Sequence, residues 1–456
     1  MPTVPPRQGP DTVKDTRLLA RAPGDVIAIR KGRFVTAAEF LAQVGGQARA
    51  LPDTGAIINI CEDRYHFLVG FAAALTRGLA TLLPPKPLDE TVLSIQREWS
   101  GSCVLTDVPG RRLAAPVVLS DPTATGPAAN AELSGGTLAA VVFTSGTTGS
   151  PVPQRKSWRT LVESTAINLQ YYFPAGPGPF TVVSTVPAQH MYGLETTVLS
   201  ALRGPVSMHD GRPFYPANVA ATLLSVPEPR VLVSTPVHLR ALAASGLAFP
   251  RLARVLSATA PLEAGLAASL EELFGCDVAE IYGCSEVGSL AWRRTALTER
   301  FGLFAGFQVL DRGGSTVISA AHLEAPVSLP DTLEPGEDGT FLLAGRDSDL
   351  VKIGGKRTSL AEVTRLIMAI PGVGDAVAFR VPGAADDTRL AALVVSGNLD
   401  GRAVRSALRP ALDPVFIPRP ILMVPGLPRS ATGKLAHDAV LRLFNDTTAV
   451  EVPRDG

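Results

Sequence analysis

The alternation of short apolar runs with amphipathic stretches constrains the fold of this 456-residue chain more than any other feature. Val26–Arg30, Ala56–Ile60 and Ala80–Leu83 are predicted to be buried strands, and Tyr65–Arg77 has helical spacing. Strands that alternate with helices predict β-α-β units and a parallel sheet. Further strands are predicted at Leu138–Thr144, Thr181–Val186, Arg230–Ser234 and Val255–Ser257, and a helix at Ala260–Phe274.

The last third of the chain has a different pattern. Thr316–Leu343 is rich in strand-like residues and turns, and Asp338-Gly339 between two apolar stretches indicates a hairpin. After Arg346 the pattern predicts an α+β module of about 110 residues, which is enough to fold as a separate domain. We therefore place the domain boundary near Asp347–Asp349. The elements expected in this module are a helix at Leu360–Ile370, strands at Ala376–Arg380 and Leu390–Val395, a helix at Arg402–Leu408 and a strand at Pro420–Val424.

Composition excludes several classes of protein. The 42 basic residues balance the 42 acidic ones, which argues against a nucleic-acid coat or a polybasic membrane-surface protein. With 46% hydrophobic residues, global disorder is not expected. The N-terminus shows no signal peptide and no apolar run approaches a membrane span, so a cytoplasmic location is expected. The cysteines Cys61, Cys103, Cys276 and Cys284 form no CxxC pair, so neither a disulfide framework nor a zinc site is predicted.

Four motifs carry chemistry. In Phe143–Pro151 (FTSGTTGSP) a buried strand leads into a loop of glycines and hydroxyls, which suits phosphate binding, and GK[ST] is absent. The others are Glu280–Glu286 (EIYGCSE), Gly345–Asp349 (GRDSD) followed by Lys352, and Pro428–Lys434 (PRSATGK). Each alone is also typical of an ordinary turn or a solvated charge cluster. Their order along the chain decides between these interpretations.

Taken in order, the motifs resemble those of the AMP-forming adenylating enzymes, which include acyl- and aryl-CoA synthetases, nonribosomal adenylation domains and luciferase. The resemblance spans Thr144–Lys434. The early region (INICEDRYHFLVGFAAALTRG, then LLPP) is most similar to AMP-ligases of bacterial aryl-polyene and xanthomonadin-type pathways. The resemblance implies an α/β fold. Residues 1–346 would form a large N-terminal domain of stacked mixed β-sheets with flanking helices and a reduced β-rich subdomain, which binds ATP and the acyl group. Residues 347–456 would form a small mobile α+β lid.

The resemblance also implies a role for individual residues. Lys434 would bridge the α-phosphate and the substrate carboxylate, and His190 would lie beside that carboxylate. Ser285 would face either the α-phosphate or the acyl carboxylate, and Ser348 would be the hinge. Glu286 and Thr148 would hold Mg²⁺. The nucleotide-binding residues implied are Thr144, Ser145, Gly146, Thr147, Thr148 and Gly149 for phosphate, Ser257, Ala258, Thr259, Ala260, Pro261, Tyr282 and Gly283 for adenine, and Asp331 and Arg346 for ribose. Lys352 would line the thiol tunnel, and Met191, Tyr192, Gly193 and Gly283 the acyl pocket.

Three positions depart from the family pattern. Val152 stands where a lysine usually follows the phosphate loop, so either Lys156 takes that role from a displaced position, which we favour, or the loop works without a lysine. Leu329-Pro330 replaces the usual Thr-Gly ahead of Asp331, and Ser348 replaces the usual hinge Asp or Lys.

The function implied is ATP-dependent activation of a carboxylic acid as an acyl-adenylate with release of pyrophosphate. An aromatic acid is expected, because a glycine at position 283 of the pocket wall leaves room for a flat ring. Transfer to a thiol would follow, either to coenzyme A or to the phosphopantetheine of an acyl carrier protein. Arg402, Arg405 and Arg409 on one helix would suit either acceptor, or form an ordinary solvated face. The alternatives are an amide synthetase, an amino-acid adenylation domain and a non-catalytic scaffold. No aspartate follows Met191 and Tyr192 to hold an amino group. A monomer or homodimer is expected, without nucleic-acid or membrane partners.

Overall fold

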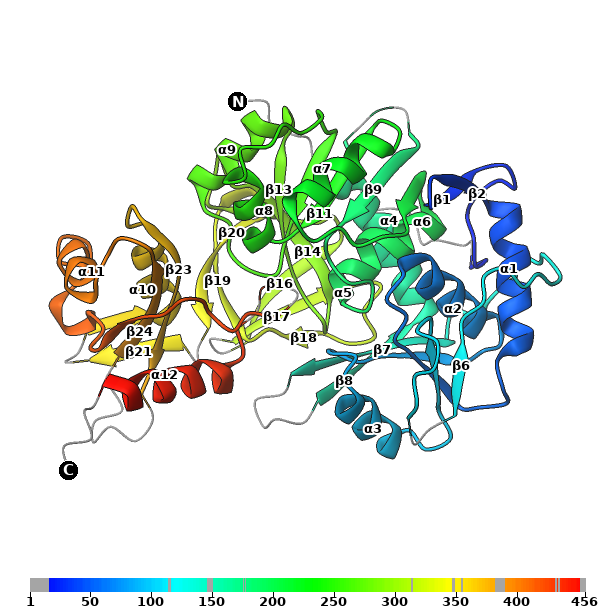
Figure 1. The fold of residues 1–456 in the computed structure, drawn as a ribbon, viewed down its shortest axis with the longest axis horizontal. Helices are drawn as coiled ribbons and strands as arrows, with labels where there is room; N and C mark the ends of the chain where they lie inside the picture. The colour runs from blue at the N-terminus through cyan, green and yellow to red at the C-terminus, as the bar shows by residue number, and fades with distance from the viewer. Residues whose placement is uncertain are drawn as a thin grey trace. The chain divides into compact units, whose positions relative to one another are not determined.

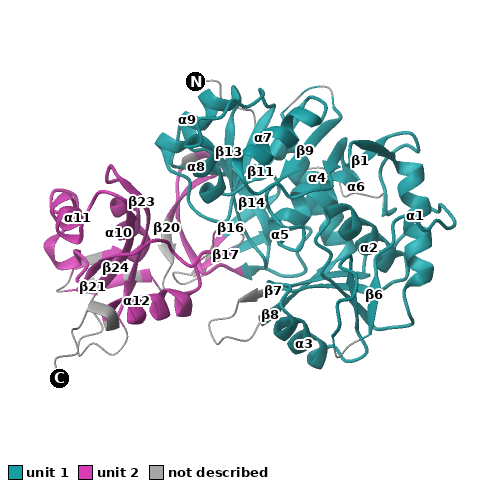
Figure 2. Ribbon diagram, viewed as in Figure 1, with its two compact units in different colours: residues 1–309, 318–327 teal, residues 310–317, 328–456 magenta. Residues whose placement is uncertain are grey.

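The computed structural model describes residues 16–113, 116–145, 151–174, 176, 178–312, 315–346, 349–353, 356–381, 390–430, 433 and 435–451. The chain forms two compact units, which Figure 2 shows in different colours. Unit 1 is Met1–Val309 with Ile318–Val327, and unit 2 is Leu310–Val317 with Ser328–Gly456. The predicted division has different boundaries, an adenylation domain at 1–346 and a lid at 347–456, and it also requires the lid to move. It stays a prediction.

A long mixed sheet forms the centre of unit 1 (Figure 1). Its strands β13, β12, β11, β9, β10 and β1 are parallel, as predicted, whereas β2 at one edge and β14 and β15 toward the other pair antiparallel. Strands such as Arg230–Ser234 are almost wholly buried because branched apolar residues suit a sheet that is covered on both faces. The strand order is β15(Phe301–Leu303), β14(Gly288–Arg294), β13(Val278–Cys284), β12(Arg254–Ser257), β11(Arg230–Ser234), β9(Phe180–Ser184), β10(Val206–His209), β1(Val26–Arg30), β2(Arg33–Thr36).

Helices cover both faces of this sheet. The core on one face is built from the helices α7(Pro216–Ser225), α8(Pro236–Ala243) and α9(Ala264–Phe274). A second core joins residues of α1(Ala37–Ala50), α2(Arg64–Thr76), α4(Trp158–Tyr172) and α6(Ser200–Arg203). The helix predicted from Ala260 begins only at Ala264, because Pro261 disfavours helical backbone in the residue before it.

A second sheet of unit 1 confirms the predicted β-α-β units. The strands β3 and β4 pair in parallel, and α2 connects them in sequence. The N-cap of α2, Asp63, accepts hydrogen bonds from the backbone N–H groups of Tyr65 and His66. The strands β7 and β8 form an antiparallel hairpin around the predicted phosphate loop. The order is β6(Val117–Leu119), β5(Cys103–Thr106), β3(Ala56–Asn59), β4(Ala80–Leu83), β7(Leu138–Ser145), β8(Pro151–Ser157), with α3(Asp89–Glu98) following β4 in sequence.

Unit 2 contains the predicted hairpin and the predicted α+β module. The strands β19(Asp331–Pro335) and β20(Thr340–Arg346) are antiparallel, and Asp338 and Gly339 between them have φ values of 59° and 71°. The chain crosses between the units in β16(Phe307–Arg312), β17(Ser315–Ala320) and β18(Val327–Ser328). The later elements are β21(Leu350–Ile353), β22(Lys356–Ser359), α10(Leu360–Met368), β23(Val373–Arg380), β24(Leu390–Ser396), α11(Gly401–Leu408), β25(Ile421–Met423) and α12(His437–Glu451).

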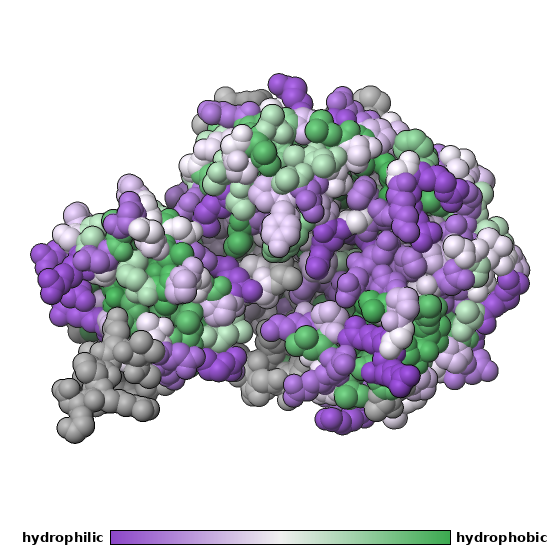
Figure 3. Space-filling view, in the orientation of Figure 1, coloured by the Kyte–Doolittle hydropathy of each residue, from purple (hydrophilic) through white to green (hydrophobic). Residues whose placement is uncertain are grey.

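The surface and the cysteines agree with the composition. On the face shown in Figure 3, apolar residues are interspersed with hydrophilic ones. Within the described part of the chain, we find no helix that is both long and apolar enough to span a membrane. The cysteines Cys61, Cys103, Cys276 and Cys284 are free thiols.

Candidate active site

The carboxyl ends of neighbouring parallel strands bring three of the predicted motifs to one edge of the large sheet. Ser184 is level with Val233, Ser234 with Ser257, and Ser257 with Glu280. From this edge the chain continues into the predicted acyl segment after β9, the predicted adenine segment after β12 and the Tyr282–Glu286 motif at the end of β13. Ligands of open α/β sheets bind outside the carboxyl ends of the strands. This edge is therefore the candidate active site.

The predicted adenine segment is held by a buried carboxylate that the sequence did not single out. Glu280 accepts hydrogen bonds from the backbone N–H of Leu262 (3.1 Å) and from Arg293 Nε (2.7 Å). Thr259 has a φ of 81°, a left-handed conformation that is unusual for a β-branched residue. Ser257 is fully buried, and its hydroxyl makes no hydrogen bond within the described residues. Of the remaining residues, Ala258 is buried, Ala260 is partly exposed and Pro261 is exposed.

The Tyr282–Glu286 motif forms the tip of the β13–β14 hairpin. Tyr282 is partly exposed, and its ring lies 5.8 Å from that of Phe301, at 54°. A side chain at Gly283 would collide with the backbone carbonyl of Gly288 on the facing strand. The close approach of the two strands therefore explains this glycine without a ring-shaped substrate.

Ser285, Glu286 and Cys284 occupy the turn of this hairpin, and all three are partly exposed. Burial, together with the nearby Glu286 charge, raises the pKa of Cys284 to about 12. A thiol with such a pKa stays protonated near neutral pH and is a poor nucleophile.

The predicted acyl segment combines a partly exposed histidine with a buried helix. His190 is the N-cap of α5(Met191–Gly193), which continues into the π-helix η1(Leu194–Leu199). Single π turns inside helices are frequent at functional sites. Met191, Tyr192 and Gly193 are buried, and the Tyr192 hydroxyl has no hydrogen-bond partner among the residues described.

Gly193 lets the helix pack against the loop that carries His190. A Cβ atom at Gly193 would collide with the backbone carbonyl of Pro187. We expect Gly193→Ala to displace that loop and to raise the KM for the acid about tenfold, with a smaller effect on the KM for ATP. Steady-state kinetics with each substrate varied in turn checks this, and Gly55→Ala, which is exposed with no atom within 4 Å of the added Cβ, tests the cost of a substituted glycine elsewhere. Equal changes in both KM values would contradict the expectation.

A buried arginine that sequence reasoning missed fixes the start of the same loop. The Arg64 side chain donates to the carbonyls of Val186 (2.7 Å) and Ser184 (3.2 Å) after β9. It also donates to those of Gly211 (3.0 Å) and His209 (3.5 Å) after β10. Burial lowers the pKa of Arg64 to about 10, so it remains cationic at neutral pH. No local pattern marks this role, because the four acceptors are more than 100 residues away in sequence.

Two further buried charges lie beneath the hairpin tip. Lys156, on β8, is 3% exposed, and its ammonium donates to the backbone carbonyl of Glu286. Burial lowers its pKa, against the opposing effect of the Glu195 charge. Glu195 in η1 is 1% exposed and accepts from Ser289, Asn168 and Tyr172. The predicted contact of Lys156 with phosphate stays a prediction. The signal for Glu195, a single acid in the apolar run GLETTVLS, was present but unused.

Some predicted residues lie in unit 2 or outside the described residues. In unit 2, Asp331 and Arg346 face each other in the register of β19 and β20, which brings the two predicted ribose residues together. Thr144 and Ser145 end β7, opposite Val152 and Pro151. Lys352 lies in β21, and for Thr144, Ser145, Arg346 and Lys352 only the backbone is described. Gly146, Thr147, Thr148, Gly149, Ser348 and Lys434 lie outside the described residues.

The described residues suit a magnesium ion that arrives with a nucleotide. Glu286 presents a partly exposed carboxylate at the candidate site, and Mg²⁺ is commonly held by one or two carboxylates together with substrate phosphates. The described residues contain no group of three or more side chains able to hold a metal ion. Such an ion would therefore bind through Glu286 and the triphosphate.

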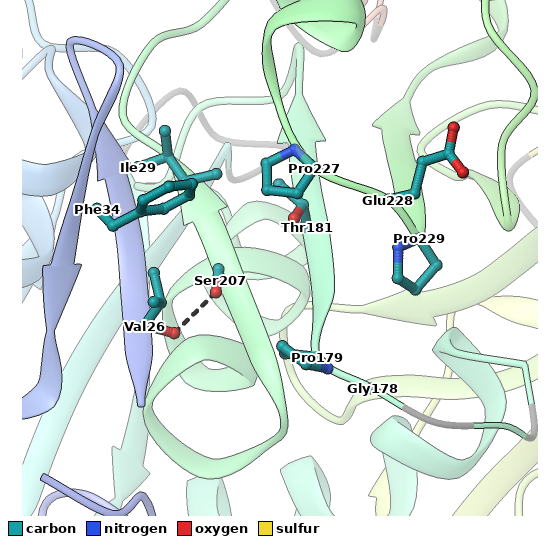
Figure 4. A pocket seen from close by; sticks show the side chains of 10 residues that line it. All are labelled: Val26, Ile29, Phe34, Gly178, Pro179, Thr181, Ser207, Pro227, Glu228 and Pro229. Carbon is teal, nitrogen blue, oxygen red and sulfur yellow. Dashed lines mark hydrogen bonds between the residues drawn. The ribbon is translucent and has the colours of Figure 1, made fainter. Parts of the chain in front are cut away.

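A separate hollow of about 190 Å³ lies at the opposite end of the parallel strands (Figure 4). Thr181 and Ser207, near the starts of β9 and β10, line it together with proline rings, and Ser207 Oγ donates to the carbonyl of Val26 (2.7 Å). None of the predicted site residues lines this hollow. It is therefore distinct from the candidate active site.

Comparison with known proteins identifies the family. The family model described as AMP-binding enzyme matches residues 17–340, which is well over half of the chain. This chain belongs to the AMP-binding enzyme family. The predicted superfamily, α/β fold and AMP-forming ligase class are thereby confirmed. The finer resemblance to pigment-pathway AMP-ligases stays a prediction.

Relatives and solved structures agree with this assignment. A 4-coumarate–CoA ligase of Rhodobacter capsulatus is 31% identical over 65% of this chain and 75% of its own length. A 3-hydroxybenzoate–CoA/4-hydroxybenzoate–CoA ligase of Thauera aromatica is 26% identical over 64% of each chain. ATP-bound MatB from Rhodopseudomonas palustris has the same fold, with a TM-score of 0.79 at 20% identity over 93% of this chain and 96% of that one. So does the o-succinylbenzoate CoA synthetase of Bacillus subtilis, with a TM-score of 0.76 at 17% identity over 95% and 97%.

Proposed function

We propose that this protein activates an aromatic carboxylic acid with ATP and transfers the acyl group to a thiol. The observation that carries the proposal is the convergence of three motifs at the carboxyl edge of β9, β12 and β13. An acid pocket, an adenine pocket and a metal-binding carboxylate are the parts that such a reaction needs side by side. The names of the relatives, 4-coumarate–CoA and hydroxybenzoate–CoA ligases, support an aryl acid.

The chemistry follows from the weakness of a carboxylate as an electrophile. Attack of a carboxylate oxygen on the α-phosphorus of ATP forms the acyl-adenylate and expels pyrophosphate. Negative charge grows on the phosphate oxygens, where the cationic Lys434 and the backbone N–H groups of the 144–149 loop would stabilise it. Magnesium supplies charge neutralisation at the phosphates when it is bound, and Glu286 would hold it. A thiol then attacks the carbonyl carbon, and AMP leaves.

We assign the two half-reactions to two positions of the C-terminal lid, 347–456, with Ser348 as the hinge. Lys434 would act in the first position, and Lys352 would line the thiol tunnel in the second. Asp331 and Arg346, opposite each other in the β19–β20 hairpin, would hold the ribose next to that hinge. Motions of this kind set the order of steps in many enzymes.

The first alternative enzyme, an amino-acid adenylation domain, would need a different acyl pocket. An amino-acid adenylation domain needs a buried carboxylate with free acceptor capacity for an ammonium. Glu195 is the acid nearest in sequence to Tyr192, and both of its oxygens already accept hydrogen bonds from Ser289. Ser289, Asn168 and Tyr172 therefore compete with any ammonium, which favours an uncharged aryl group.

A panel of acids tests the proposed reaction. We expect pyrophosphate release above background with hydroxylated benzoic or cinnamic acids and none with amino acids. Release with amino acids alone would favour the adenylation-domain alternative. Release with no acid from a folded, ATP-binding protein would favour the scaffold alternative.

The acceptor is tested by mass spectrometry of the product. Purified protein is incubated with ATP, the best acid and either coenzyme A, a phosphopantetheinylated carrier protein or a primary amine. We propose that a thioester forms. A stable amide with no thioester would instead identify an amide synthetase.

A further inference from the structure

Two buried residues of opposite charge, Lys156 and Glu195, form hydrogen bonds to the backbone of the turn that carries Glu286 and of the residue Ser289 that follows it. The turn joins Cys284 to Gly288, which face each other in the β13–β14 register. A three-residue connection that is partly exposed at its tip has several conformations of similar energy unless its neighbours fix it. The backbone conformation of the turn sets the direction in which the Glu286 side chain points.

Lys156 holds the first side of the turn. Its ammonium comes from β8 in the other sheet and donates to the backbone carbonyl of Glu286. Because Lys156 is 3% exposed, water does not compete for this bond, and a charged donor makes a stronger hydrogen bond than a neutral one. The contact fixes the peptide plane on the C-terminal side of Glu286.

Glu195 holds the second side. Oε1 accepts from the backbone N–H of Ser289 (3.3 Å), and Oε2 accepts from Ser289 Oγ (2.8 Å). The carboxylate also abuts Gly288, whose φ is 91° and where a Cβ atom would lie 2.6 Å from Oε1. Asn168 Nδ2 (3.2 Å) and the Tyr172 hydroxyl (3.4 Å) hold Glu195 itself in place.

This arrangement differs from an ordinary buried ion pair. Lys156 bonds to the carbonyl of Glu286 in the middle of the turn, and Glu195 bonds to Ser289, just beyond its end, so both charges hold the backbone of the same hairpin tip. Burying two charges is costly unless a specific geometry is gained. The geometry gained is that of the turn Ser285–Val287, which lies at the candidate active site.

We propose that Lys156 and Glu195 are positioning residues that hold Glu286 in the orientation needed to bind magnesium with the nucleotide. The inference rests on the proposed function, because it takes Glu286 as the metal ligand. It gives Lys156 a role that acts through the backbone of Glu286, in place of the direct phosphate contact that the sequence predicted.

The test measures metal binding without turnover. Mn²⁺ replaces Mg²⁺, and its affinity for the protein with a non-hydrolysable ATP analogue is followed by electron paramagnetic resonance. We expect Lys156→Met to weaken Mn²⁺ binding about tenfold and Glu195→Gln about threefold, with unchanged affinity for the analogue in the presence of a chelator. The matched controls Lys86→Met and Glu272→Gln change exposed residues and are expected to bind Mn²⁺ like the wild type.

Glu286→Gln separates the two levels of the proposal. If Glu286→Gln weakens Mn²⁺ binding but Lys156→Met and Glu195→Gln, both folded by circular dichroism, do not, the positioning role is overturned and the proposed function stands. If Glu286→Gln leaves Mn²⁺ binding unchanged, the metal assignment of the proposed function fails, and the inference fails with it. If Lys156→Met and Glu195→Gln both bind the ATP analogue more weakly when no metal is present, the site is generally damaged, and the inference is also overturned. Should Lys156→Met not fold, the more conservative Glu195→Gln decides.

Discussion

Lys434→Ala is expected to reduce acyl-adenylate formation about a thousandfold while leaving thioester formation from a supplied acyl-adenylate within about threefold of wild type. The loss has the size seen when one preorganised group that stabilises transition-state charge is removed. The second step is spared because the lid is proposed to turn Lys434 away before the thiol attacks. Rapid-quench assays of the two steps, begun separately, measure both rates.

The control for this experiment is Arg442→Ala, which removes an exposed cation from α12 of the same unit and is expected to leave both steps unchanged. Equal losses in both steps of Lys434→Ala would contradict the two-position lid. Unchanged adenylation would remove Lys434 from the catalytic residues altogether.

Arg64→Met is expected to lower the free energy of unfolding of unit 1 by about 3–5 kcal/mol, the cost of removing one partner from a buried charged network. The guanidinium donates hydrogen bonds to the carbonyls of Ser184, Val186, His209 and Gly211. Methionine at position 64 would leave these acceptors without that donor. Because the Ser184–Val186 backbone leads to His190, we also expect a higher KM for the acid. Urea unfolding followed by tryptophan fluorescence measures the stability.

Arg33→Met is the matched control, since Arg33 is largely exposed and pairs with the surface residue Glu39 at 2.9 Å. Exposed ion pairs contribute about 0–1 kcal/mol, so this variant should unfold near the wild-type midpoint. If Arg64→Met unfolded at the same urea concentration as Arg33→Met, the anchoring role of Arg64 would be wrong.

Sequence reasoning predicted the parts of the fold that are encoded locally. Branched apolar runs such as Ala80–Leu83 became buried parallel strands, and Asp338-Gly339 supplied the positive φ values of a hairpin. The family resemblance carried by the order of the motifs implies that the adenine segment and Tyr282–Glu286 belong to one site. The parallel topology then explains why they meet, because neighbouring parallel strands end at the same edge.

The supporting charges were not predictable in the same way. Arg64 and Glu280 act on backbone groups that are distant in sequence or on another strand, so no spacing reveals them. Glu195 stands out as a single acid in an apolar run, but the sequence does not show that it binds Ser289. Lys156 is the first lysine after the phosphate loop and was expected to take the role missing at Val152, yet its pairing opposite Ala140 places it several residues along the hairpin from that loop. Its partner, the carbonyl of Glu286, follows only from how the two sheets of unit 1 are packed.

The central claim, activation of a carboxylic acid through an acyl-adenylate, is tested most directly by oxygen-isotope transfer. The protein is incubated with ATP, an acceptor thiol and an aryl acid labelled with ¹⁸O in its carboxylate, and the nucleotide product is analysed by mass spectrometry. Attack of the carboxylate on the α-phosphorus, followed by cleavage of the acyl–oxygen bond, predicts AMP that carries one ¹⁸O atom. Unlabelled AMP, or ADP with labelled inorganic phosphate, would contradict the account.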